Sequence, residues 1–226
     1  MKKYFELRFL NRDDIGSLYS LDTSGGSTKI NEVKEAIRKD LLSSDSEILM
    51  EVDPKSGTGK KRLGDIVFWQ KGSPNAHVLI ISRRFADFLK SLNTPKYKLY
   101  KVKIVNLDEG EYFIFHLLGD SFDMIDYHEQ IFFKKNVMND TNEGYIGKGT
   151  FSSKEKFMSE RAMLIESKSQ TLSFDTVIYA KEYDLLWGFS TLILVNETLK
   201  EKIKQQSFLL DFKEFNKYII DYTPQS

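Results

Sequence analysis

The stretch that decides the fold reads HVLIISRRFADFLKSLN over residues 77–93, followed by KYKLYKVKIVN over 96–106 and EYFIFHLLGD over 111–120. It starts with the short apolar run Val78 to Ile81, which is too short for a helix and typical of a buried strand. Ser82 ends the run, and its hydroxyl is suited to cap a helix by accepting from first-turn N–H groups. Apolar side chains then recur at i, i+3, i+4 and i+7 and predict one buried helix face, made of Phe85, Phe88, Leu89 and Leu92.

Beyond Pro95 the apolar residues change from helical spacing to alternation, as expected for strands. Residues 97–107 alternate between apolar and polar side chains, and residues 112–118 form a second, more apolar segment. The turn Asp108-Glu109-Gly110 separates the two segments and predicts a hairpin. Residues 77–131 therefore predict a strand, a helix and a hairpin that pack together, without an obvious nucleophile or set of metal ligands.

The composition bounds the classes of protein to which the chain can belong. Its 226 residues contain no cysteine, which excludes disulfides, thiolate catalysis and thiolate metal sites. Lys and Arg together number 33, as do Asp and Glu, so we expect no nucleic-acid partner. No apolar run reaches the roughly 18 residues of a membrane-spanning helix, and no secretory signal is visible. These features predict a cytoplasmic protein that uses neither a membrane nor a cofactor.

The remaining segments predict further strands and helices in a mixed order. A strand pattern opens the chain at Tyr4–Leu10, a helical pattern covers Ile30–Leu41, and Ala162–Glu166 and Val177–Ala180 have the character of short strands. Strands grouped into hairpins, with about three helices packed on them, predict an α+β fold with a mixed, largely antiparallel sheet.

We expect a single α+β domain over residues 1–226. The alternative is a pair of lobes, 1–138 and 154–226, joined by the glycine-rich loop 139–153.

A second strand and helix pattern stands near the C-terminal end. TLILVNETLKEKIKQQ, residues 191–206, aligns with the first strand and helix, and Asn196 takes the place of Ser82. Apolar residues again follow at helical spacing, here Leu199 and Ile203. The two strand-helix units are either an internal duplication or a convergent pair.

Two patterns that often carry chemistry fail on their spacing. Residues 56–61 lack the first glycine of a phosphate-binding loop, because Pro54 occupies that position, and we expect an exposed basic turn there. Among His77, His116 and His128, no pair has the i, i+4 spacing that places two imidazoles on a helix face. We expect His116 to be a buried or half-buried histidine, and we expect no metal site.

Acidic residues gather around the first hairpin. Asp120, Asp123 and Asp126 recur every three residues, which brings their carboxylates together if the segment turns like a helix. Such a group can bind a hard cation or serve as turn and cap chemistry, and the calcium-loop pattern is missing. With the preceding turn, the segment predicts an acidic surface for a basic partner, formed by Asp108, Glu109, Glu111, Asp120 and Asp123.

The order of the segments carries a family resemblance. LGDIVFWQ, HVLIISRRFADFLKSLN, KLYKVKIVN, EYFIFHLLGDSFDMID and VIYAKEYDLLWGFSTLILVNETLKEKIKQQSF together resemble bacterial immunity proteins of polymorphic-toxin systems, a family formerly catalogued as a domain of unknown function. Ser82, Asp126 and Asn196 match positions of that pattern, and Gln205 to Phe208 depart from its usual glycine-containing turn. The resemblance implies a protein that is not an enzyme and carries no catalytic residues. It also implies that the chain binds and neutralises a cognate toxin, which we expect to be basic, for example a nuclease.

Two other functions stay open on the residues alone. A small enzyme acting on a phosphate-containing or polar small molecule would use His116 or His128 with the aspartates in one pocket. A nucleic-acid-binding module would use the basic turn, namely Lys55, Lys60, Lys61 and Arg62, and its affinity would fall steeply with salt.

Overall fold

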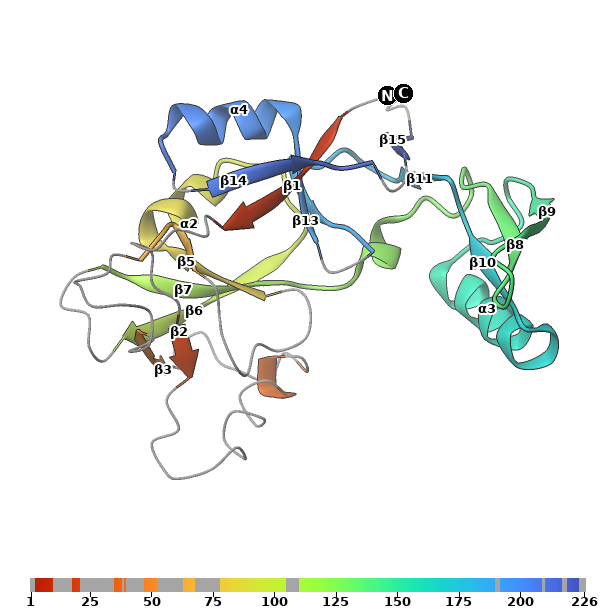
Figure 1. The fold of residues 1–226 in the computed structure, drawn as a ribbon, viewed down its shortest axis with the longest axis horizontal. Coiled ribbons are helices and arrows are strands. Elements are labelled where there is room, and N and C mark those ends of the chain that lie inside the picture. Colours follow the sequence, from red (N-terminus) through yellow and green to blue (C-terminus); the bar gives the residue numbers. More distant parts are fainter. Residues whose placement is uncertain are drawn as a thin grey trace. The chain divides into compact units, whose positions relative to one another are not determined.

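The computed structural model describes residues 3–9, 18–20, 35–37, 39, 47–52, 63–67, 78–104, 110–189, 192–208, 210–216 and 219–223 (Figure 1). These residues form helices and mostly antiparallel strands, which confirms the predicted α+β class. They group into two compact units. Unit 1 takes in Asp120–Tyr183 with the described residues of Met1–Tyr4 and Glu214–Ser226, and unit 2 takes in the described residues of Phe5–Gly119 and Asp184–Lys213.

Unit 2 contains a six-stranded sheet built around the predicted hairpin. Its strands in spatial order are β2 (Leu18–Ser20), β3 (Glu47–Val52), β6 (Tyr97–Ile104), β7 (Tyr112–Leu117), β5 (Val78–Ser82) and β4 (Ile66–Val67). The pairing of β3 with β6 is parallel and the other pairings are antiparallel. Strand β7 lies between β6 and β5 and is buried along its whole length, which explains why its sequence is apolar on both faces.

Helix α2 (Arg83–Leu89) follows β5 directly, as the apolar spacing predicts. The backbone of Ser82 is extended, and its Oγ accepts from the Phe85 N–H at 3.1 Å, so the predicted cap is confirmed. Phe85 and Leu89 are fully buried and share a hydrophobic core with Phe115 of β7. The i, i+4 spacing therefore places one helix face against the sheet.

A four-stranded sheet in the order β12 (Leu185–Trp187), β13 (Ile193–Asn196), β1 (Tyr4–Phe9) and β14 (Leu210–Glu214) carries the second strand-helix unit. Helix α4 (Glu197–Gln205) follows β13, and the side chain of Asn196 accepts from the Leu199 N–H at 2.8 Å. Leu199 and Ile203 are buried in the same core as Phe85. The predicted cap and helix are confirmed, and the internal duplication stays a prediction.

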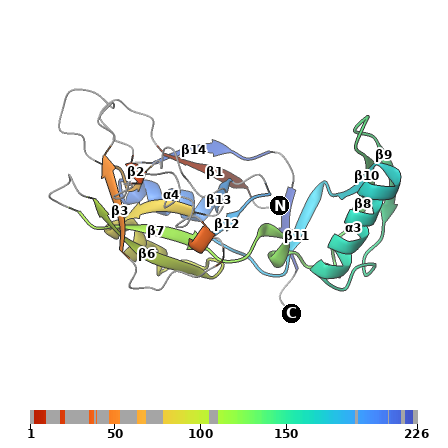
Figure 2. The ribbon, with the colours of Figure 1, turned by 90° about the horizontal axis from the view of Figure 1, so that it is seen from below.

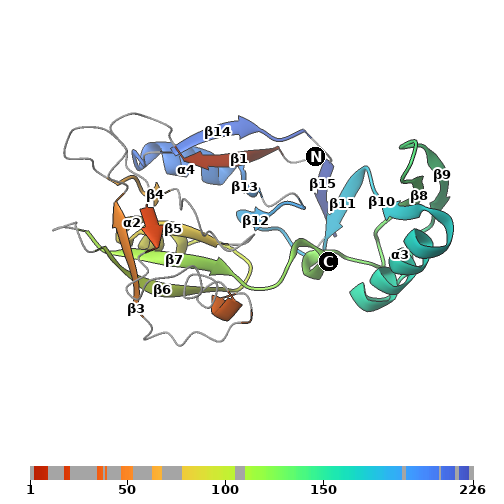
Figure 3. The same ribbon diagram turned by 60° about the horizontal axis from the view of Figure 1, so that its bottom comes forward.

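Unit 1 contains a three-stranded sheet in the order β10 (Gln170–Ser173), β8 (Phe132–Asn136) and β9 (Asn142–Ile146). Helix α3 (Lys154–Lys168) packs along this sheet, next to β10 (Figures 2 and 3). The rings of Phe132 on β8 and Phe157 on α3 stack with their centroids 4.7 Å apart. The unit also holds the short 3-10 helix η1 (Ser121–Met124) and the parallel pair β11 (Thr176–Tyr179) and β15 (Ile219–Tyr222).

The strand predicted at Ala162–Glu166 is wrong, because these residues lie in the second half of α3. Ser153 caps α3 by accepting from the Lys156 N–H, and Leu164 is the residue of the apolar run that is buried. The glycine-rich segment 139–153 lies inside unit 1 and contains β9, so it does not separate the two units. The choice between one domain over 1–226 and two lobes stays a prediction.

The pairing of β9 with β8 contains a register shift. Lys134 pairs with Gly144 and Lys135 pairs with Asn142, so Glu143 is an extra residue that bulges from β9. Gly144 has a φ of 143°, in the region that glycine adopts without strain.

Of the helix predicted at Ile30–Leu41, residues 35–37 are described and helical, and Ile37 is fully buried.

Candidate functional site

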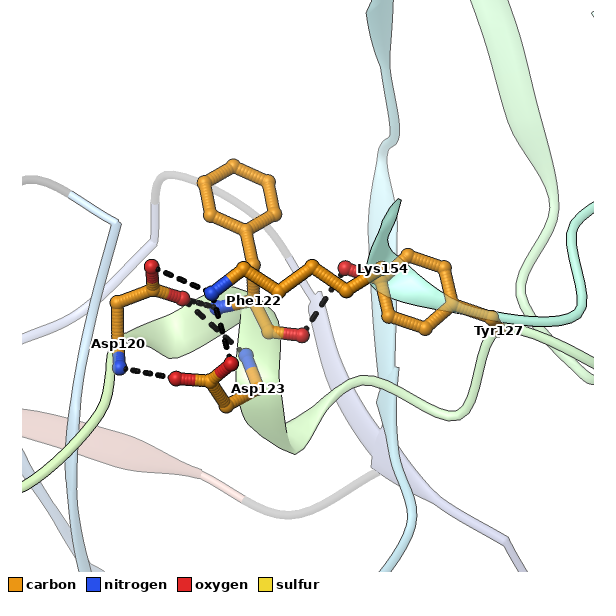
Figure 4. Close-up of polar contacts among 5 residues, drawn as sticks. All are labelled: Asp120, Phe122, Asp123, Tyr127 and Lys154. Carbon is orange, nitrogen blue, oxygen red and sulfur yellow. Dashed lines mark hydrogen bonds and ion pairs between the residues drawn. The ribbon is translucent and has the colours of Figure 1, made fainter. Parts of the chain in front are cut away.

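The aspartate-rich segment after β7 folds into η1 and uses its carboxylates within the chain (Figure 4). Oδ1 of Asp120 accepts from the N–H groups of Phe122 at 2.8 Å and Asp123 at 3.2 Å. Asp123 in turn accepts from the Asp120 N–H at 2.6 Å, which completes a capping box. The two aspartates therefore lie together, and turn and cap chemistry brings them together.

Lys154 at the start of α3 binds both of these carboxylates (Figure 4). Its Nζ lies 2.9 Å from Oδ2 of Asp120 and 2.7 Å from Oδ1 of Asp123. Burial lowers the pKa of Lys154, but the hydrogen bonds to Asp123 and Asp120 outweigh burial and hold the pKa above its ordinary value. The lysine stays cationic, and the two carboxylates share it.

Tyr127 connects this cluster to the aromatic core of unit 1. Its hydroxyl donates to the Phe122 carbonyl at 3.0 Å, and its ring lies 5.6 Å from that of Phe157. Burial, with the nearby charges of Asp120 and Asp123, raises the pKa of Tyr127, so the phenol is neutral at physiological pH. The carboxylates are thus held on a segment whose backbone is fixed by buried side chains.

Asp126 has a separate role and does not join the other two aspartates at Lys154. Its Oδ1 accepts from the N–H groups of His128 at 3.1 Å and Glu129 at 3.2 Å, and its Oδ2 accepts from the Thr223 hydroxyl at 2.5 Å. Burial raises the pKa of Asp126, but these hydrogen bonds outweigh burial and hold the pKa below its ordinary value. Asp126 therefore shapes a turn and binds Thr223, the residue that follows β15.

The predicted acidic surface is divided between the two units. Glu111 belongs to unit 2, where it accepts from Nε of Arg83 at 2.9 Å, and this hydrogen bond lowers the pKa of Glu111. Asp120 and Asp123 belong to unit 1, and Asp108 and Glu109 lie outside the described residues. Each described member of the set already has a cation partner within its own unit, a feature that sequence reasoning did not foresee.

The cap residues Ser82 and Asn196 are each supported by an aspartate that sequence reasoning missed. Oγ of Ser82 donates to Oδ1 of Asp65 at 2.8 Å, and Nδ2 of Asn196 donates to Oδ1 of Asp184 at 3.0 Å. Both positions are structural: they start a helix and tie it to the strand that runs beside it.

The histidines lie in different surroundings. His116 is buried on β7, which confirms the expected buried histidine, and its ring stacks with Tyr100 at 6.3 Å between centroids. His128 belongs to unit 1, and its side chain is 80% exposed, with Nδ1 3.2 Å from Oε1 of Glu129. His77, Trp69 and the basic turn Lys55–Arg62 lie outside the described residues.

Exposed apolar side chains mark unit 1 more clearly than charge does. Every large apolar residue that is exposed in the described part of the chain belongs to unit 1: Ile131, Val137, Met138, Tyr145, Met158, Met163, Ile165 and Ile219. Sequence reasoning missed this surface because it assigned part of α3 to a strand. The available signal was Ser153 with Glu155 before a long segment, a pattern that favours the start of a helix.

Within the ranges that the structure describes, no three His, Asp or Glu residues come together as metal ligands. None of the described helices is long and apolar enough to cross a membrane. No family model, curated protein or solved structure matches the chain.

Proposed function

We propose that the chain is a non-enzymatic immunity protein that binds a cognate bacterial toxin and blocks it. The observation that carries this proposal is the concentration of exposed large apolar side chains in unit 1. Exposed apolar groups gathered on one part of a protein favour binding to another protein, because association removes them from water. The order of strands, caps and helices that resembles immunity proteins supports the same function.

The size of the surface is sufficient for this role. A standard protein interface covers about 800 Å² on each partner. The whole chain exposes 12837 Å², so the partner needs only a small part of the surface. Unit 1 supplies both components of such an interface, namely apolar side chains for its centre and the Asp120–Asp123–Lys154 cluster for its polar rim.

The charged cluster contributes to the choice of partner. Asp120 and Asp123 share Lys154, and their side chains remain 42% and 46% exposed. An arginine or lysine of a basic toxin can approach these carboxylates and share them with Lys154. This arrangement favours a toxin with a basic binding cleft, such as a nuclease.

The test is a titration of toxin activity. The chain is purified and added to the isolated toxic domain encoded by the gene next to its own. We expect activity to fall linearly and to vanish at an equimolar ratio, and we expect co-expression to rescue growth. Inhibition at far below equimolar amounts would contradict a binding mechanism, and undiminished activity at an excess of the chain would contradict the proposed function.

A further inference from the structure

Exposed apolar side chains lie on one face of α3 and in the turn between β8 and β9. On α3 the strip consists of Met158, Ala162 and Ile165, which are spaced at i, i+4 and i+7 and therefore share one helix face. From Met158 to Ile165 the helix rises by about 10 Å. The turn adds Val137 and Met138. These five residues are called the apolar strip below.

A backbone hydrogen bond joins the two parts of the apolar strip. The N–H of Val137 donates to the carbonyl of Ser169, the C-cap of α3, at 2.9 Å. Ile165 lies one helical turn before Ser169, on the same side of the helix. The neighbouring Met138 is held by its N–H, which donates to Oδ1 of Asn136 at 2.9 Å. The turn is therefore fixed beside the C-terminal end of the helical part.

The apolar strip is not the face by which α3 packs on its own sheet. That face consists of Phe157 and Leu164, which are 0% and 1% exposed. In the strip, Met158 is 38% exposed, Ile165 47%, Val137 56% and Met138 85%. Two of the five residues are methionines, whose flexible side chains adapt to an apolar partner surface.

Glutamates border the open side of the apolar strip. Glu155 precedes Met158 by three residues and Glu166 follows Ala162 by four, so both residues border the strip on the helix surface. A hydrogen bond with Ser153 lowers the pKa of Glu155, which keeps it anionic. On the other border, Lys154 is held by Asp120 and Asp123, and Nε of Arg161 donates to Thr171 at 3.2 Å. Lys168 adds a single exposed cation at the last turn.

We propose that the apolar strip binds a cationic amphipathic helix presented by the toxin. The apolar face of that helix would cover Met158, Ile165 and the turn, and its lysines or arginines would meet Glu155 and Glu166. This inference rests on the proposed function and names the partner's chemistry. It also assigns the centre of the interface to α3, whereas the predicted acidic surface placed it at the hairpin.

The methionine methyl groups report on the strip directly, because the chain has six methionines and they sample distinct positions. The full chain is labelled with methyl-¹³C methionine and titrated with a synthetic amphipathic helix of leucine and lysine. Met138 and Met158 should shift and saturate. Met163, on another face of α3, and Met50, in the core of unit 2, should stay unchanged. A matched peptide of leucine and glutamate should bind at least about tenfold more weakly because of Glu155 and Glu166.

The variant Met158→Glu/Ile165→Glu should lose the peptide-induced shift of Met138, because a carboxylate in an apolar interface is costly to desolvate. Met163→Glu is the matched control, since it places the same charge on an exposed methionine of the same helix. It should bind the lysine peptide like the wild type. Circular dichroism and the resonance of buried Met124 confirm that both variants are folded.

Several outcomes would overturn the inference. Three concern the peptides: equal shifts at Met163 and Met158, equal binding of both peptides, or no shift at saturating peptide. The fourth is a shift of Met138 and Met158 when the chain alone is diluted, which would indicate that a second copy occupies the strip. The toxin titration separates this inference from the proposed function. If the wild type and Met158→Glu/Ile165→Glu both neutralise the toxin, the apolar strip does not bind the toxin, and the proposed function stands. If the wild type does not neutralise the toxin, the proposed function is wrong, and the peptide titration still decides whether the strip binds a cationic amphipathic helix.

Discussion

Two modules of unit 2 start their helices in the same way. The first module consists of Asp65, β4, β5, Ser82 and α2, and the second consists of Asp184, β12, β13, Asn196 and α4. In each, the N–H of the cap residue donates to the aspartate carbonyl, at 2.9 Å in the first and 3.0 Å in the second. The cap side chain also donates to Oδ1 of the same aspartate. The aspartate thus holds the cap residue in the orientation in which its side chain accepts from an N–H group of the helix.

The modules differ in how each aspartate reaches the other module. Asp184 is bound directly to Asn93, just beyond α2: its Oδ2 accepts from the Asn93 N–H at 2.8 Å, and its N–H donates to the Asn93 carbonyl at 2.8 Å. Asp65 reaches the end of α4 through Arg84, whose Nη1 lies 4.0 Å from Oδ2 of Asp65 and whose Nη2 donates to the Gln206 carbonyl. The link to the Asn93 backbone is short and direct, whereas the contact of the exposed arginine with Asp65 is long and screened by solvent. The second module should therefore contribute more to the stability of unit 2.

The largest expected effect is that of Asp184→Ala. The substitution removes an acceptor from Nδ2 of Asn196, which is buried, and another from the Asn93 N–H. The loss of two hydrogen bonds to a carboxylate should lower the free energy of unfolding by about 3 kcal/mol. The measurement is urea unfolding followed by the fluorescence of Trp187, in a Trp69→Phe background that leaves one tryptophan in the chain.

Asp65→Ala is the matched variant for this comparison. It removes the hydrogen bond from Ser82 and the 4.0 Å contact with Arg84, so we expect a loss of about 1.5 kcal/mol. Equal losses for the two aspartates would show that the direct link to Asn93 adds nothing.

The sequence predicts what local patterns encode in these modules. Apolar runs predict β5 and β13, and a polar cap before apolar residues at helical spacing predicts α2 and α4. The aspartates were not predicted, because Asp65 precedes Ser82 by 17 residues and Asp184 precedes Asn196 by 12, and no local rule connects residues so far apart.

Unit 1 shows why other parts were missed. Helix α3 buries Phe157 and Leu164 and exposes apolar side chains elsewhere, so its sequence has no single apolar face to indicate a helix. At the candidate site, spacing predicted that Asp120 and Asp123 meet, since a turn brings neighbours together. Their shared partner Lys154 lies 31 residues beyond Asp123, and the apolar strip depends on the hydrogen bond between Val137 and Ser169. Such contacts are set by the tertiary fold.

An intermediate effect is expected for Asn196→Asp. The introduced carboxylate keeps the acceptor for the Leu199 N–H but replaces the amide donor next to Oδ1 of Asp184. Two carboxylates in contact repel each other, which should lower the free energy of unfolding by about 2 kcal/mol at pH 7. Repulsion raises the pKa of the introduced carboxylate in the folded protein above its value in the unfolded chain. The variant therefore loses free energy of unfolding as the pH rises through that raised pKa. At about pH 4 the difference from wild type should be smaller. A difference that does not change between the two pH values would contradict direct contact.

The smallest effects test whether the two caps are interchangeable. Ser82→Ala removes the acceptor for the Phe85 N–H and should cost about 1 kcal/mol. Ser82→Asn places the cap of the second module in the first, where the amide oxygen can accept from Phe85 while the amide nitrogen donates to Asp65. If the two caps are geometrically equivalent, Ser82→Asn should stay within about 0.5 kcal/mol of wild type in the same urea measurement. A loss as large as that of Ser82→Ala would mean that the first module has room only for a hydroxyl. The two modules would then have different cap geometries, although each has an aspartate at the corresponding position.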